Sequence, residues 1–233
     1  MRIALSGCAK TVMLALTIAV AGGPAVAHHV GVYVPRDNEV SANFKQIKFA
    51  LQARKFDVAL GLFDSGALRA EMRARVADLP AGLEASTRGA IAAGDAPAAE
   101  RWLMVFFAAL ARDLAQEADR RLADPGGSAA ARAASGRKFL EAITRYYNLI
   151  DFAVTQQDSK AAVAVRLALD DAEGYAKDNG PRPAGAPGST PKGTTGQTVA
   201  APDPAKMREP LQRIAQTLSR LIETSSTSTR RIP

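Results

Sequence analysis

The stretch GDAPAAERWLMVFFAALARDLAQEADRRLADPGG, residues 94–127, decides the fold. Asp95 is a favourable N-cap, and Pro97 fits the first turn of a helix, where its missing N–H group is not needed. Apolar residues recur at helical spacing to about Ala123, and the sequence DPGG at 124–127 then stops the helix. The segment therefore predicts one long helix whose apolar stripe consists of Leu103, Phe106, Phe107, Leu110 and Leu114.

Helical patterns continue on both sides of this segment, and no convincing strand is present beyond residues 30–34. Short polar turns separate the helices, which is typical of antiparallel neighbours. The sequence therefore predicts an all-α fold, an antiparallel helical bundle of about five to six helices in a domain over residues 28–180. Besides the central segment, the predicted helices cover about 41–55, 57–76 with a bend at Gly66, a weaker stretch over 80–94, 128–157 and 158–175.

The composition changes after residue 180. Residues 181–204 are dominated by Pro, Gly, Thr, Ala and Ser, which predicts a flexible, disordered linker. Residues 205–233 then predict a separate amphipathic C-terminal helix with a basic tail. This helix either reaches a partner or folds back onto the body. Its apolar residues follow a 4-3-4-3 spacing: Met207, Leu211, Ile214, Leu218 and Leu221.

The net charge of +7 is distributed unevenly along the 233 residues. Residues 28–180 carry 20 basic and 20 acidic side chains, whereas residues 181–233 carry 8 basic and 3 acidic ones. The basic charge therefore belongs to the C-terminal appendage, and the predicted domain is neutral. No region has the dense basic surface interleaved with aromatic residues that nucleic-acid binding requires, so we expect no nucleic-acid partner.

The pattern of residues 1–27 predicts a secretory signal peptide. Two basic residues precede a short apolar run at 11–20, and Ala25-Val26-Ala27 matches the small-x-small pattern of a cleavage site. The run is shorter than the roughly 20 residues that a membrane span needs. We therefore expect a periplasmic or otherwise extracytoplasmic protein, cleaved near Ala27. The only cysteine, Cys8, would leave with the signal peptide.

The only two histidines, His28 and His29, stand at the start of the predicted mature chain. The α-amine and imidazole of His28 can chelate a metal together, and His29 can add a second imidazole. Imidazole nitrogen suits Cu(II), and exported proteins with an N-terminal histidine bind copper in this way. The sequence thus predicts a copper site at His28 and His29. The alternative is a solvated polar stub left by processing.

A weaker metal candidate lies in the segment 145–152. Tyr147 and Asp151 are four residues apart, so they share one face of the predicted helix. Their oxygen atoms suit a hard cation such as iron. The alternative is a Tyr–Asp hydrogen bond that holds a helix interface together.

No enzymatic chemistry is indicated by the sequence. With both histidines at the predicted N-terminus, the Ser–His–Asp triad, the HExxH zinc site and the di-iron Glu-x-x-His pair have no histidine to use. Two functions remain: an exported protein that binds copper, or less favourably iron, for metal handling or delivery; and a non-enzymatic interaction module of a periplasmic or membrane-associated complex. The second would contact a membrane surface or protein partner through residues 205–233.

Overall fold

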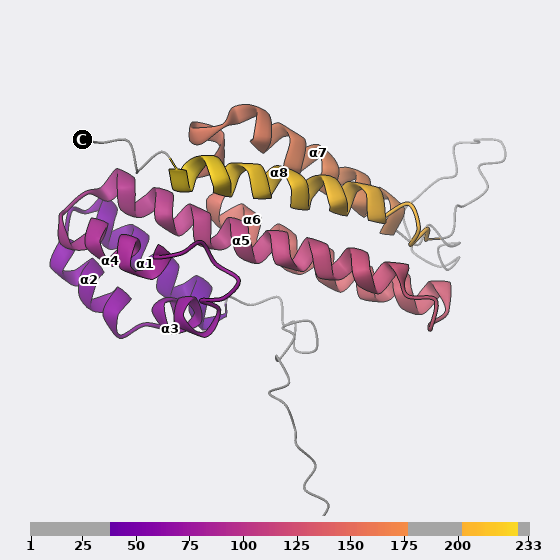
Figure 1. The fold of residues 1–233 in the computed structure, drawn as a ribbon, viewed down its shortest axis with the longest axis horizontal. Helices are drawn as coiled ribbons and strands as arrows, with labels where there is room; N and C mark the ends of the chain where they lie inside the picture. The colour runs from indigo at the N-terminus through magenta and orange to yellow at the C-terminus, as the bar shows by residue number, and fades with distance from the viewer. Residues whose placement is uncertain (1–37, 177–201, 228–233) are drawn as a thin grey trace, which may run out of the picture.

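The computed structural model describes residues 38–176 and 202–227, and these form eight α-helices and no strand (Figure 1). This confirms the prediction of an all-helical fold for the described part of the chain. The predicted signal peptide and residues 181–201 of the predicted linker lie outside it. The helices are α1 (Glu39–Gln52), α2 (Phe56–Asp64), α3 (Ala67–Ala74), α4 (Leu83–Ala92), α5 (Ala96–Ala123), α6 (Ala129–Gln157), α7 (Ser159–Ala176) and α8 (Arg208–Thr227).

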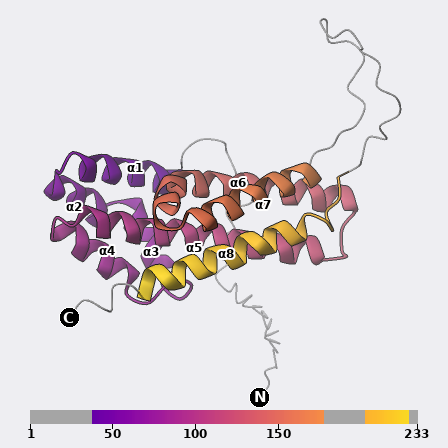
Figure 2. The ribbon, with the colours of Figure 1, turned by 90° about the horizontal axis from the view of Figure 1, so that it is seen from above.

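Helix α5 is the centre of the molecule. Asp95 caps it as predicted, since its carboxylate accepts a 3.0 Å hydrogen bond from the Ala98 N–H group. Every residue from 102 to 111 is buried, so this part of the helix is covered on all sides rather than along one stripe. Helices that are apolar all round are interior helices. Helices α1, α4, α6 and α8 supply the cover (Figure 2).

Helix α5 contacts α6 and α8, and α7 contacts the same two helices (Figures 1 and 2). Ser128 caps α6 after a short turn, and Asp158 alone separates α6 from α7. The start of α8 lies against the end of α7, because the Asp203 N–H group donates a 3.0 Å hydrogen bond to the Tyr175 carbonyl. Arg208, at the start of α8, pairs with Asp119 near the end of α5 at 2.7 Å.

Helices α1 to α4 gather around the first half of α5 (Figures 1 and 2). Aromatic side chains join them to the long helices. The Phe44 ring of α1 meets the Phe107 ring of α5 edge-on at 4.7 Å, and Tyr146 of α6 lies 5.8 Å from Phe107 on another side. Asn38 caps α1 and also donates a 2.9 Å hydrogen bond to the Tyr146 hydroxyl. Helices α1 to α4 and helices α5 to α8 therefore share one hydrophobic core.

The helix predicted over 57–76 is in fact two helices, α2 and α3, and the described chain has more than the five to six helices expected. The break falls at Gly66, where a bend was predicted. Asn43 of α1 occupies the corner: its amide donates to the Leu62 carbonyl at 3.0 Å, and its Oδ1 accepts from the Leu68 N–H group at 3.1 Å. These two hydrogen bonds replace helical ones that the break removes.

The expectation of a separate C-terminal helix also differs from the structure. Helix α8 packs between α5 and α7. The five apolar residues with 4-3-4-3 spacing, which we call the α8 seam, are all buried: Met207, Leu211, Ile214, Leu218 and Leu221. Met207 reaches into a notch that Gly136 of α6 leaves open, where an added Cβ would lie 2.8 Å from the methionine methyl carbon. The physical reason for the fold-back is the apolar area of the seam, which is removed from water only when α8 joins the bundle.

Shortening the connection between α7 and α8 is expected to stabilise the protein. Replacing the 25 residues 177–201 with Gly-Ser-Gly-Ser leaves enough chain, because Tyr175 and Asp203 already share a hydrogen bond. The lower cost of closing a shorter loop should raise the free energy of unfolding by about 1.5 kcal/mol. Urea titration of both proteins, followed by circular dichroism, measures the change. A less stable short form would mean that residues 177–201 support the bundle.

Candidate functional sites

The predicted copper ligands, His28 and His29, lie outside the described residues. The described chain begins at Asn38, ten residues after His28, and Asn38 is held against Tyr146. The structure therefore describes the helical body that follows the histidines but not the histidines themselves. The copper site stays a prediction.

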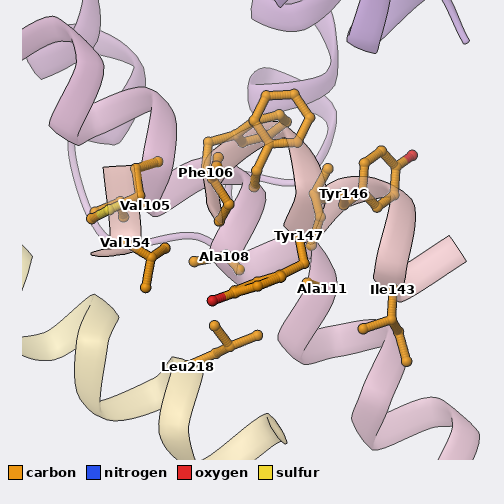
Figure 3. Close-up of a cluster of buried hydrophobic side chains, with 14 of the residues drawn as sticks. Val105, Phe106, Ala108, Ala111, Ile143, Tyr146, Tyr147, Val154 and Leu218 are labelled. Atoms are coloured by element: carbon orange, nitrogen blue, oxygen red, sulfur yellow. The ribbon is translucent and has the colours of Figure 1, made fainter. Parts of the chain in front are cut away.

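Tyr147 is part of the core. Figure 3 shows its ring among Ala108 of α5, Val154 of α6 and Leu218 of α8, and only 1% of the residue is exposed. Its hydroxyl donates a long hydrogen bond of 3.4 Å to the Ala162 carbonyl of α7. Burial raises the pKa of Tyr147, and the nearby negative charge of Asp151 raises it further. Iron binds tyrosine as the phenolate, so this environment opposes iron binding.

Asp151 is engaged by an arginine from the neighbouring helix. Arg166 of α7 donates from Nε and Nη2 to the two carboxylate oxygens at 2.8 and 2.6 Å, and its Nη2 also donates to the Thr155 hydroxyl at 2.9 Å. An iron ion at Asp151 would have to displace this bidentate pair. The contacts therefore favour the interpretation in which the segment joins α6 to α7.

Other charged groups also connect helices. Asp64 of α2 pairs with Arg69 of α3 at 2.6 Å and with Arg88 of α4 at 2.9 Å, and the hydrogen bond from Arg88 lowers the pKa of the Asp64 carboxyl. Asp113 of α5 lies between Arg112 and Arg75, and its burial raises the pKa of its carboxyl. Each acid is matched by arginines, as expected for charges that fix helix positions.

No group of three or more His, Cys, Asp or Glu side chains that could hold a metal ion occurs in residues 38–176 and 202–227. A groove of about 340 Å³ runs between α5 and α8, lined by Gln116, Ala215, Gln216, Ser219 and Arg220. These side chains offer amide groups, a hydroxyl and a guanidinium, and no pair of a nucleophile and a base. The Ser219 hydroxyl donates to the Ala215 carbonyl of its own helix.

Comparison of the chain with known proteins gave no match, whether to a family model, to a curated protein or to a solved structure. Within the described ranges, no helix has the length and apolarity needed to cross a lipid bilayer.

Proposed function

We propose that the chain is an exported, non-enzymatic helical-bundle protein that binds copper at its mature N-terminus and buffers or delivers it in the periplasm. The observation that carries this proposal is the position of His28-His29 directly after the cleavage motif Ala25-Val26-Ala27. Cleavage there makes the α-amine of His28 a ligand, next to its own imidazole. No other pair of adjacent histidines occurs in the sequence.

The geometry of the body is compatible with such a terminal site. Asn38, where the described bundle begins, stands ten residues after His28, and the described core includes neither histidine. A third donor must be a carboxylate, a tyrosine or a methionine, because all histidines are used. Iron at Tyr147 and Asp151 is the weaker proposal, since burial keeps the phenol protonated and Arg166 holds the carboxylate.

The mature protein is expected to bind one Cu(II) ion tightly, and His28→Ala should weaken binding by about a hundredfold through loss of the imidazole that chelates with the amine. Isothermal titration with Cu(II) in a competing chelator measures the affinity. The matched control carries one extra glycine before His28, which keeps both imidazoles but moves the α-amine away. It should lose affinity to a similar extent.

Three results would contradict the copper proposal. The first is a mature N-terminus, identified by mass spectrometry, at any residue other than His28. The second is equal affinity of the mature protein and the glycine-extended control, which would show that the α-amine is not a ligand. The third is a dissociation constant weaker than about 1 μM, roughly −8 kcal/mol of binding free energy, which is too weak for delivery.

The second candidate function is that of an interaction module acting through residues 205–233. The observation that bears on it is the burial of the α8 seam in the core. A membrane surface or a protein that used the seam would first have to displace α8 from α5 and α7. We therefore favour recognition of one helix by a groove between others over attachment to a lipid surface.

A further inference from the structure

Helix α8 is bound to the rest of the molecule as an amphipathic helix is bound in a groove. The α8 seam lies between α5 and α7 and also touches α6 at Gly136 and Tyr147. Four of its residues are fully buried: Met207, Leu211, Ile214 and Leu218. Anchors at such helical spacing are typical of helix-in-groove recognition. The opposite face of α8 is polar and exposed, with Glu209, Gln216, Arg220 and Glu223.

Charge pairs set the register of α8 in this groove. Asp119 of α5 accepts hydrogen bonds from Arg208 at 2.7 Å and from Gln212 at 3.1 Å. On the other wall, Asp171 of α7 pairs with Arg213, one helical turn further along α8. Complementary charges of this kind add specificity more than affinity. The groove thus carries acids at the positions where α8 carries Arg208 and Arg213.

The covalent connection to α8 is far longer than the geometry requires. The Tyr175 carbonyl and the Asp203 N–H group are 3.0 Å apart. If residues 177–201 were absent, these two residues would be i and i+3 of a β-turn. The chain instead has 25 residues here, whereas connections between bundle helices usually have about two to eight. Fully extended, 25 residues reach roughly 80–90 Å, enough to place α8 on a neighbouring molecule.

We propose that α5 and α7 form a helix-binding groove in which α8 is a separable occupant, and that the α8 of a second copy of this chain can fill it. An exchanged pair makes the same contacts as two closed monomers, because both grooves are filled by identical helices. The monomer is favoured only by the effective concentration that the connection provides, about 1 mM for such a linker. Exchange therefore grows with protein concentration.

The test uses full-length mature chains, which carry no cysteine once Cys8 is removed. One batch carries Asp119→Cys in the groove and the other carries Arg208→Cys on α8, two positions that meet in the folded chain. The batches are mixed, warmed briefly, cooled and treated with a short bis-maleimide. We expect the share of chains in the cross-linked pair of one chain from each batch to be about 25-fold higher at 1 mM than at 10 μM.

Three controls separate exchange from random collision. A single chain carrying both cysteines must cross-link within itself, which validates the geometry. Phe49→Cys lies on an exposed position of α1 and replaces Asp119→Cys in a mixture that reports collisions alone. The third control is a charge exchange, with Asp171→Arg in the Asp119→Cys chain and Arg213→Asp in the Arg208→Cys chain. Each closed monomer then sets like charges together, and only the exchanged pair restores both ion pairs, so the product at 10 μM should rise at least threefold.

The proposal is overturned if the groove and α8 cysteines give no more cross-copy product than the Phe49→Cys mixture at 1 mM. It is also overturned if the charge exchange at residues 171 and 213 leaves the yield unchanged, since the product would then not come from the groove. Neither result touches the copper proposal, because no part of this experiment involves His28 or His29.

Discussion

Phe107→Ala is expected to lower the free energy of unfolding by about 3–5 kcal/mol, the usual cost of deleting a buried phenylalanine ring. Phe107 is fully buried in α5 and contacts rings from both parts of the molecule. The Phe44 ring of α1 lies 4.7 Å away, the Phe106 ring 5.1 Å and the Tyr146 ring 5.8 Å. Helices α1, α5 and α6 would line the resulting cavity. They could close it only by giving up some of their other contacts.

The matched control is Phe49→Ala. Phe49 belongs to α1, as Phe44 does, but 71% of it is exposed, so its removal should change stability by less than about 0.5 kcal/mol. Guanidinium titrations of the three proteins, monitored by tryptophan fluorescence and circular dichroism, give the free energies. Coincident transitions by the two probes are expected for Phe107→Ala, because the rings join both parts into one core. A loss below about 1 kcal/mol would place Phe107 outside that core.

For α5, the local sequence predicts where the helix begins and ends but not which helices cover it. Asp95, Pro97 and the DPGG stop at 124–127 fix α5 because caps and breakers act within a few residues of themselves. The sequence predicted one buried stripe, whereas the structure covers residues 102–111 on all sides. The cover comes from α1, α4, α6 and α8, the last of which is more than 80 residues away in the sequence. Periodicity shows that an apolar face exists but not which distant face will cover it.

The same limit explains the Tyr147–Asp151 segment. Spacing correctly placed both residues on one helix, and both a metal site and a structural contact fit that pattern. What distinguishes the two is the approach of Arg166 from α7, which depends on how the α6–α7 hairpin closes. The split of the predicted helix 57–76 has a similar cause, since the side chain that stabilises the break belongs to Asn43 on another helix.

Gly66→Ala is expected to destabilise the protein by about 3 kcal/mol, the upper part of the range for added atoms in a packed site. An added Cβ at Gly66 would lie 2.2 Å from Asn43 Oδ1 and 2.3 Å from the Leu62 carbonyl oxygen. The first atom can swing away only by giving up the hydrogen bonds that bridge α2 and α3. The second is backbone, so the junction itself must open.

The same substitution at Gly89 should have the opposite sign. Gly89 lies inside α4, and apart from its own helix backbone no atom stands within 4 Å of the place where its Cβ would be. Alanine there gains about 0.5–1 kcal/mol from helix propensity alone. Thermal unfolding of the two variants beside the parent protein therefore tests the junction directly, because one chemical change is made at two glycines. If both variants shift the midpoint upward, the break between α2 and α3 does not depend on the space that Asn43 occupies. If Gly66→Ala alone falls, the corner is held by close packing of Asn43 against a residue that has no side chain.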